Sequence, residues 1–325
     1  MPTLLRLLTV IVLLTVPLAT AAQPGNRVYQ IGWLSGTAVS SPESAEAFRQ
    51  SLREFGWIEG RNFVLVFRHG DGQADQLAQR AAELVKMNVD VIVATVPAAL
   101  TPARNATSTI PIVMVYGPDP AAAGVVSSLA RPGGNVTGLT SLSVDLAVKQ
   151  LELLKAIIPQ VSRVGVLWNP ANPWHPSALQ RLDPAARELS IGVRNVSVRG
   201  PEDFNSALVT MKQEQLGAIL NLSDPMTFSH RALLAELALK HLLPMMSGVT
   251  EYTEAGGLAS YWPNTADTFR NAAVYVHRIL SGARPSDLPV EQPRKFELVI
   301  NLKTAKSLGV IIPAGVLARA DKLIE

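Results

Sequence analysis

Short apolar runs alternate with amphipathic stretches along the first half of the chain. The apolar runs are YQIGWLS at 29–35, NFVLVFR at 62–68 and VDVIVAT at 89–95. Between the first two runs, apolar side chains recur at steps of three and four, for example at Phe48 and Leu52. Short apolar runs bounded by polar residues are typical of buried strands, and steps of three and four are typical of helices with one buried face. The pattern predicts a β-α-β-α-β unit.

The second half of the chain repeats this order of elements. Strands are predicted at 163–168 (RVGVLW), 192–198 (GVRNVSV) and 217–223 (GAILNLS), with helical patterns between them. Each strand lies about 130 residues after its counterpart in the first half. Two copies of one supersecondary unit account for this pattern better than a single irregular fold does. We therefore predict the α/β class, with two doubly wound parallel-sheet lobes.

Composition supports two folded lobes and argues against one class of partner. The 325 residues are 48% hydrophobic and 17% charged, which is enough apolar surface for two cores and too much for a disordered chain. The formal net charge is only +3, and the basic residues are scattered rather than gathered in a stripe. Proteins that bind nucleic acids concentrate lysine and arginine on one face. No nucleic-acid partner is expected.

The N-terminus has the three-part pattern of a secretory signal peptide. Arg6 precedes an apolar stretch at 7–18, and small residues follow up to Ala22. A membrane anchor is the alternative, but the apolar stretch is shorter than the roughly 20 residues that span a bilayer. Residues 1–22 are therefore predicted to be a cleaved signal peptide, and the mature chain is predicted to be periplasmic. Because the chain contains no cysteine, the exported protein must fold without disulfides.

Candidate binding residues are sought at the carboxyl ends of the predicted strands. In parallel α/β sheets the helices cover both faces, and ligands meet the loops at these strand ends, where helix N-termini offer unpaired N–H groups. These loops are rich in serine, threonine, asparagine and aspartate, with an occasional tyrosine. The candidate ligand-binding residues are Ser35, Ser41, Thr95, Tyr116, Asn169, Asn172, Asp224, Ser247, Glu251, Tyr252 and Tyr261.

Several of these residues also have a purely structural interpretation. Asp224 is followed by proline, and Asp-Pro is typical of a helix N-cap and its first residue. Asn169 and Asn172 each precede a proline and can simply shape a turn. Glu251 and Tyr252 precede a Gly-Gly turn, so a solvated loop accounts for them as well as a ligand does. Both interpretations stay open from the residues alone.

The chain carries none of the common catalytic motifs. The phosphate-binding G-x-x-x-x-G-K-[ST], the dinucleotide-binding G-x-G-x-x-G, the nucleophile elbow G-x-S-x-G and the zinc motif H-E-x-x-H do not occur. The five histidines have no metal-ligand spacing, and no thiolate can form without cysteine. The loops offer a histidine base only at His175 and His230. A binding protein without metal or cofactor is expected, and an exported α/β enzyme is the alternative.

Three segments of the chain resemble a known family. They are GPDPAAAGVVSSLARPGGNVTGLTSLS from Gly117, EAGGLASYWPNTADTFRNAAVYVHRILSGARPSDLPVEQP from Glu254 and FELVINLKTAKSLGVIIP from Phe296. They resemble the ABC transporter substrate-binding proteins of the tryptophan/tyrosine type, and the likeness extends from about Val28 to Glu325. The resemblance implies a type I periplasmic binding protein, in which two similar α/β lobes joined by a three-segment hinge hold a small ligand. It also implies an ABC permease in the cytoplasmic membrane as the partner.

With this architecture, lobe 1 is predicted to comprise residues 27–140 and 263–290, and lobe 2 residues 141–262 and 291–325. The predicted function is that of an extracytoplasmic solute-binding protein of an ABC importer, a monomer that captures a small solute by hinge closure. The solute is expected to be an amino acid, with the aromatic amino acids included. A receptor domain that passes the closed state to a signalling partner is the alternative.

The resemblance to an amino-acid-binding family gives the polar candidates separate roles. The carboxylate of an amino acid would meet hydroxyls and helix N-terminal N–H groups near Ser35, Ser41 and Thr95. Its ammonium would need a carboxylate, with Asp224 and Glu251 as the candidates. The polar candidates therefore cover both charged groups of an amino acid.

The aromatic candidates are expected to cover an apolar side chain of the ligand. Tyr116, Tyr252 and Tyr261 are the residues proposed for this role. Trp262 follows Tyr261 at a position where the resemblance leads us to expect a glycine. The pocket is therefore predicted to differ in size from the pockets of relatives that hold an aromatic amino acid.

Overall fold

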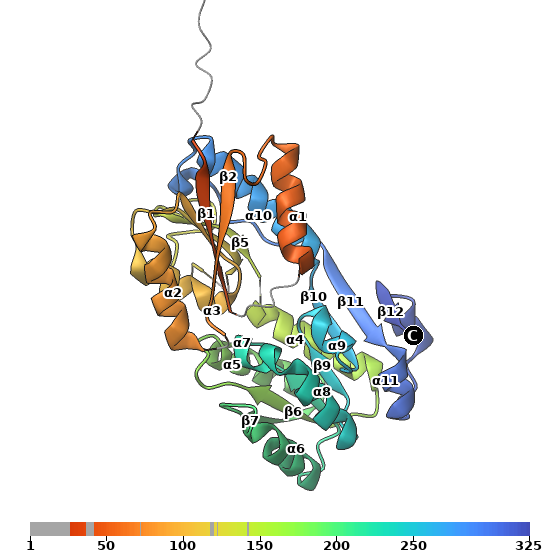
Figure 1. Ribbon diagram of the computed structural model, residues 1–325. Coiled ribbons are helices and arrows are strands. Elements are labelled where there is room, and N and C mark those ends of the chain that lie inside the picture. Colours follow the sequence, from red (N-terminus) through yellow and green to blue (C-terminus); the bar gives the residue numbers. More distant parts are fainter. Residues whose placement is uncertain (1–26, 37–41, 72, 118–119, 122, 142) are drawn as a thin grey trace, which may run out of the picture.

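The computed structural model describes residues 27–36, 42–71, 73–117, 120–121, 123–141 and 143–325. These residues form two α/β lobes, one above the other in Figure 1. The two-lobed α/β class predicted from the sequence is thereby confirmed. The predicted signal peptide and Ser41 lie outside the described residues. Within the described part of the chain, no helix has both the length and the apolar character needed to cross a membrane.

The sheet of lobe 1 has five parallel strands in the order β2-β1-β3-β4-β5. Their bounds are β1 Tyr29–Ser35, β2 Phe63–His69, β3 Val91–Ala94, β4 Ile112–Gly117 and β5 Val136–Thr140. Helices cover both faces, with α1 (Pro42–Glu54) and α10 (Thr265–Leu280) on one, and α2 (Ala74–Lys86) and α3 (Pro97–Ala106) on the other. Neighbouring strand residues point to opposite faces, so Trp33 packs under α1 and Leu34 under α2.

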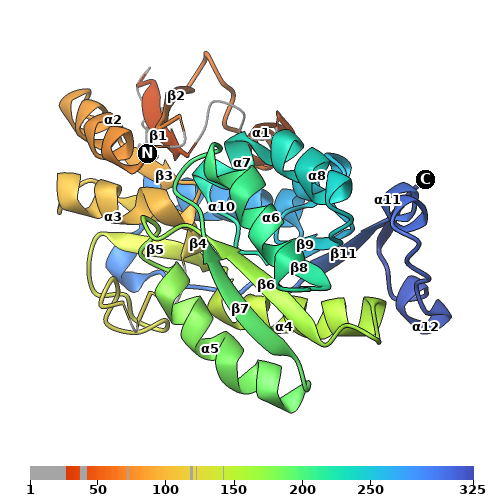
Figure 2. The same ribbon diagram turned by 90° about the horizontal axis from the view of Figure 1, so that it is seen from below.

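The sheet of lobe 2 has seven strands in the order β12-β11-β10-β9-β8-β6-β7. Their bounds are β6 Arg163–Trp168, β7 Gly192–Ser197, β8 Ala218–Asn221, β9 Met245–Ser247, β10 Ala259–Pro263, β11 Phe296–Asn301 and β12 Lys322–Ile324. Figure 2 shows α4 (Ser143–Ile157) and α5 (His175–Glu188) on one face, and α6 (Asp203–Gln213) and α8 (Arg231–Lys240) on the other.

One strand pair of lobe 2 departs from the prediction. The pair β10–β11 is antiparallel, whereas the other pairs of this sheet are parallel. The chain leaves lobe 2 after β10, forms α10 on lobe 1 and returns as β11, so β11 enters the sheet from the opposite end. The predicted parallel-sheet lobe is confirmed for the sheet as a whole, and this one antiparallel pair is an addition that the sequence pattern did not predict.

Several segments expected to be loops contain the first turn of a helix. Helix α3 begins at Pro97, and two further helices are α7 (Pro225–Ser229) and α9 (Thr250–Glu254). Proline is favourable at the first helical position, because the N–H that it lacks would have no partner within the helix there. Glu251 and Tyr252 thus lie on a short helix and not in a solvated loop. The remaining short helices are α11 (Leu302–Ser307), α12 (Ala314–Leu317) and the 3-10 helix η1 (Pro285–Asp287).

The chain passes between the lobes three times, from β5 to α4, from β10 to α10 and from η1 to β11. Asn264 joins the second passage to the third. Its side-chain oxygen accepts from the Asp267 N–H at 2.7 Å and caps α10, and its amide nitrogen donates to Glu297 of β11 at 2.6 Å. A bridge between Leu139 and Glu291 holds the third passage beside the end of β5. The connecting segments therefore support one another.

Candidate functional site

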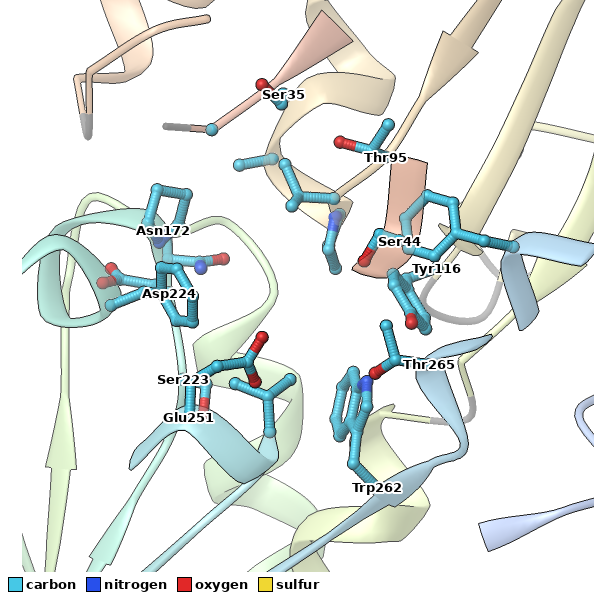
Figure 3. Close-up of a pocket in the computed structure, with 18 residues that line it drawn as sticks. Ser35, Ser44, Thr95, Tyr116, Asn172, Ser223, Asp224, Glu251, Trp262 and Thr265 are labelled. Carbon is cyan, nitrogen blue, oxygen red and sulfur yellow. The ribbon is translucent and has the colours of Figure 1, made fainter. Parts of the chain in front are cut away.

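A cavity of about 150 Å³ lies between the two lobes, at the carboxyl ends of their strands (Figure 3). Lobe 1 contributes the ends of β1, β3 and β4 and the first turns of α1 and α3. Lobe 2 contributes the turns that follow β6, β8 and β9, and the passage from β10 to α10 completes the wall. Parallel pairing places these turns at one edge of each sheet, as expected for ligand sites in α/β proteins.

Six of the predicted binding residues line this cavity: Ser35, Thr95, Tyr116, Asn172, Asp224 and Glu251. That they contact a ligand stays a prediction. Sequence reasoning missed four further lining residues with a polar group: Ser44, Ser223, Trp262 and Thr265. Ser44 and Thr265 lie in the first turns of α1 and α10, and Ser223 directly precedes Asp224. The place of Ser44, Ser223 and Thr265 just after a strand or at a helix start could have identified them, whereas Trp262 lies within β10.

Four predicted residues do not line the cavity: Asn169, Ser247, Tyr252 and Tyr261. Tyr252 is fully buried, and its hydroxyl shares a 2.7 Å hydrogen bond with the Thr227 hydroxyl. Burial raises the pKa of Tyr252. Tyr261 points to the face of β10 opposite to Trp262 and stacks on Phe296, with ring centroids 5.6 Å apart. The Tyr252 ring is therefore buried in the core, and the half-buried Tyr261 ring packs against Phe296 on the other side of the sheet from the cavity.

Asn169 shapes a turn beside the cavity, and Ser247 is the last residue of strand β9. The Asn169 side chain accepts from the Ala171 N–H at 3.0 Å, which is the structural role that its sequence context also allowed. Its own N–H donates to His175 Nδ1 at 3.0 Å, and burial lowers the pKa of His175, which keeps the imidazole neutral and able to accept. The Ser247 hydroxyl lies 3.5 Å from the Asn221 amide nitrogen.

The lobe 1 side of the cavity favours negative charge. Val96, Pro97 and Ala98 at the start of α3 line it, so the N-terminal end of this helix faces the cavity. The first N–H groups of a helix have no partner within it, and the helix dipole adds a partial positive charge there. The Thr95 hydroxyl donates to the Leu34 carbonyl at 3.1 Å, so its oxygen is held at the strand end.

Asp224 serves as a helix cap as well as lining the cavity. Its side chain accepts from the Thr227 N–H at 2.8 Å, and the Asp224 N–H donates to the Thr227 hydroxyl at 3.2 Å, which forms a capping box for α7. In Figure 3 its carboxylate is turned away from the Glu251 carboxylate. The structural interpretation of the Asp-Pro pair is therefore correct, and a ligand contact of Asp224 stays a prediction.

The Glu251 carboxylate points into the cavity from the first turn of α9 (Figure 3). Burial raises the pKa of Glu251, and the nearby Glu254 carboxylate adds to the rise while Arg231 opposes it. No lysine or arginine occurs among the described residues that line the cavity. The site therefore favours a positive group beside Glu251.

Aromatic rings form one wall of the cavity. Tyr116 and Trp262 have ring centroids 5.6 Å apart, and Tyr116 meets Phe269 edge to face at 6.0 Å. Burial raises the pKa of Tyr116 to about 12. Phe228 lines the cavity from α7. This wall presents flat apolar surfaces of the kind that pack well against another aromatic ring.

The sequence matches a family model described as ABC transporter substrate binding protein over residues 37–324. The chain belongs to this family. The resemblance drawn from three sequence segments is thereby confirmed, and so is the type I periplasmic binding fold that it implied.

One protein compared by sequence and two compared by solved structure are among those similar to this chain. The tyrosine-binding protein of Clostridioides difficile (strain R20291) is 26% identical over 272 residues, which cover 83% of this chain and 78% of that protein. A conserved domain protein from Vibrio cholerae has a TM-score of 0.83 at 30% identity, with 91% of this chain and 99% of that chain covered. The ABC domain from Streptococcus pneumonia in complex with L-Trp has a TM-score of 0.82 at 26% identity, with the same coverage of both chains.

The cap role of Asp224 can be tested through stability. Asp224→Ala is expected to lower the free energy of unfolding by about 1 kcal/mol, because the Thr227 N–H then loses its acceptor. Asp224→Ser still offers an oxygen acceptor and is expected to cost much less. Denaturant unfolding of both variants measures the difference. Equal losses for alanine and serine would contradict the cap role.

Proposed function

We propose that the protein is the extracytoplasmic solute-binding protein of an ABC importer and that its ligand is an aromatic amino acid. The observation that carries the proposal is the composition of the cavity, where a half-buried carboxylate, an aromatic wall and a helix N-terminus meet between the lobes. Each of these parts matches one part of an aromatic amino acid. The names of the tyrosine-binding relative and of the structure with L-Trp support this choice.

The polar ends of the ligand are assigned by charge. Its ammonium binds Glu251, with Asp224 as the second negative charge of the wall. Its carboxylate binds near Ser35 and Thr95, where the N-terminal end of α3 supplies N–H groups and a partial positive charge. The zwitterion thus spans the cavity, with its ammonium on lobe 2 and its carboxylate on lobe 1.

The side chain of the ligand packs against Tyr116, Trp262 and Phe269. A dissociation constant of about 1 μM corresponds to roughly 8 kcal/mol. Charge-assisted hydrogen bonds contribute about 1.5 to 3 kcal/mol each, and burial of an aromatic side chain contributes about as much again. The summed contribution of a few such bonds and one buried ring is therefore close to the binding free energy that a micromolar dissociation constant requires.

Capture proceeds by closure of the two lobes. A ligand that touches both lobes favours the closed arrangement by the difference between its affinities for the two states. The lobes comprise residues 27–140 with 263–290 and residues 141–262 with 291–325, and the three passages form the hinge. After removal of residues 1–22 the protein works as a monomer in the periplasm and delivers its ligand to a membrane permease without chemical turnover.

A binding screen of the mature protein tests the proposed ligand class. L-Tyrosine, L-tryptophan or L-phenylalanine at 100 times its dissociation constant is expected to stabilise the fold by about 2.7 kcal/mol, seen as a raised thermal midpoint. Leucine, dicarboxylates and sugars serve as matched controls. A raised midpoint with a sugar or a dicarboxylate, and none with the three aromatic amino acids, would refute the proposal.

Protonation of Glu251 is expected to release the ligand. The raised pKa means that this carboxyl becomes neutral at a higher pH than an ordinary glutamate, which titrates near 4.3. Affinity should therefore fall as the pH drops through this raised pKa, because the neutral acid cannot pair with the ammonium. Calorimetric titration between about pH 7 and pH 4 measures the effect.

The matched variant for this pH effect is Glu251→Gln. It removes the charge and is expected to weaken binding at neutral pH by roughly 10- to 150-fold, and to flatten the pH dependence. An unchanged slope in this variant would assign the pH dependence to another group.

Closure brings Gly36 of lobe 1 against Pro225 of lobe 2. A Cβ atom at Gly36 would lie only 2.9 Å from the Pro225 ring. Gly36→Val is expected to hold the lobes apart and weaken binding by about 1 to 3 kcal/mol, which is roughly 5- to 150-fold. Gly134→Val is the matched control, because a Cβ there meets no atom within 4 Å. Calorimetry measures the affinities, and small-angle scattering measures how far the two lobes are open. Equal effects of Gly36→Val and Gly134→Val on affinity would argue against closure at the contact between Gly36 and Pro225.

A further inference from the structure

A buried pair of hydroxyls joins the two turns of lobe 2 that bring carboxylates to the cavity wall. Asp224 precedes α7, and Glu251 lies in the first turn of α9. Behind them, the Thr227 hydroxyl of α7 and the Tyr252 hydroxyl of α9 share a hydrogen bond of 2.7 Å. Both residues are fully buried, and neither lines the cavity. The pair therefore lies on the protein side of the site, out of reach of a ligand.

The Thr227 end of this link is tied to Asp224. The Thr227 N–H donates to the Asp224 carboxylate at 2.8 Å, and the Thr227 hydroxyl accepts from the Asp224 N–H at 3.2 Å. Threonine has a β-branched side chain with a stiff χ1 angle, which limits the directions that its hydroxyl can take. The bond to Tyr252 therefore starts from a fixed point on the turn that holds the Asp224 carboxylate.

The Tyr252 end of the link carries Glu251, its neighbour on α9. This helix has five residues, and a helix so short depends on tertiary contacts for its position because it has little stability of its own. The Tyr252 hydroxyl also has side-chain hydrogen bonds with Asn221 and Ser223, and the Tyr252 ring meets Phe228 edge to face at 5.9 Å. Tyr252 therefore anchors α9 to the segment that runs from the end of β8 into α7.

We propose that Tyr252 is a positioning residue, which through Thr227 holds Glu251 and Asp224 in the arrangement that receives a positive group. The inference rests on the proposed function, in which Glu251 pairs with the ammonium of an amino acid. A carboxylate that is fixed before binding loses little freedom when the ligand arrives, whereas a loose one must first be ordered. Loss of the link should therefore weaken binding of the ammonium and leave the aromatic wall and the lobe 1 side of the cavity unchanged.

The first test needs no ligand and follows the Glu251 carboxyl by carbon NMR, with Glu251→Gln to identify its signal. Burial raises the pKa of Glu251, the Glu254 and Glu43 carboxylates raise it further and Arg231 lowers it. Tyr252→Phe should move this pKa toward the ordinary value of about 4.3, because a loosened α9 lets water reach the carboxylate. An unchanged pKa would overturn the proposal. Thr227→Val removes the other hydroxyl and gives the same test should Tyr252→Phe not fold.

The second test compares ligands with and without an ammonium group. L-Tyrosine, L-tryptophan and L-phenylalanine are each paired with the propionate that carries the same ring and carboxylate but no ammonium. Tyr252→Phe should weaken binding of the amino acid by roughly 3- to 10-fold and leave binding of the propionate within about twofold. In the Thr227→Val background the same substitution should change the affinity by less than about twofold, because its partner is already gone. Calorimetry provides all the affinities.

Tyr275→Phe is the matched control, because it also removes one hydroxyl that is hydrogen-bonded inside the protein. The Tyr275 hydroxyl donates to the Pro289 carbonyl at 2.6 Å, and the residue does not line the cavity. Tyr275→Phe and Tyr252→Phe should both lower the thermal midpoint of the ligand-free protein, since each loses such a bond. Only Tyr252→Phe should move the pKa of Glu251 and the ratio of the affinities for amino acid and propionate. Equal changes in both variants would mean a general loosening of the fold and would overturn the proposal.

The outcomes separate this inference from the function on which it rests. If no aromatic amino acid binds the unsubstituted protein, the proposed ligand class fails, and the pKa of Glu251 in Tyr252→Phe still decides whether Tyr252 positions this carboxylate. If the amino acids bind and Tyr252→Phe weakens amino acid and propionate equally, the inference alone fails. It also fails if Tyr252→Phe keeps its full effect in the Thr227→Val background. A lowered pKa together with a loss confined to the ligand that has an ammonium supports it.

Discussion

Because the strands of lobe 1 and most strands of lobe 2 run parallel, their carboxyl ends gather along one edge of each sheet. The two edges face each other, and the polar lining residues lie at strand ends or in the turns and first helical turns that follow. Helices that start at this edge also aim their N-terminal ends at the cavity. The shared direction of the parallel strands thus produces both the concave shape of the site and part of its charge distribution.

The charge distribution across the cavity is asymmetric. Lobe 2 supplies Asp224 and Glu251, and lobe 1 supplies the N-terminal end of α3 and several hydroxyls. The proposed zwitterionic ligand would be oriented by this asymmetry, with its ammonium toward lobe 2 and its carboxylate toward lobe 1. The raised pKa of Glu251 reports the cost of burying its charge, and a ligand ammonium would offset that cost. The Asp224 carboxylate caps α7, and the same residue lines the cavity.

The second passage between the lobes belongs to the site itself. Trp262 precedes Asn264 and Thr265 follows it, and Asn264 caps α10 and holds Glu297. A ligand that packs against Trp262 therefore touches the segment about which the lobes would move. Contact with a connecting segment gives a small molecule a direct way to favour one lobe arrangement over another. The contact between Gly36 and Pro225 shows how closely the two rims approach.

The local pattern of the sequence was sufficient for the fold class, the strand positions and six lining residues, because periodicity and strand ends are properties of neighbouring residues. It was not sufficient for Tyr252 and Tyr261, which sit beside lining residues and yet point into the protein. The face on which a side chain lies depends on strand pairing with distant segments. Trp262 joined the cavity wall, and β11 paired antiparallel, only because the chain left lobe 2 for α10 and came back. Tertiary structure decided these points, since contacts between residues far apart in the chain leave no periodic signal in either segment.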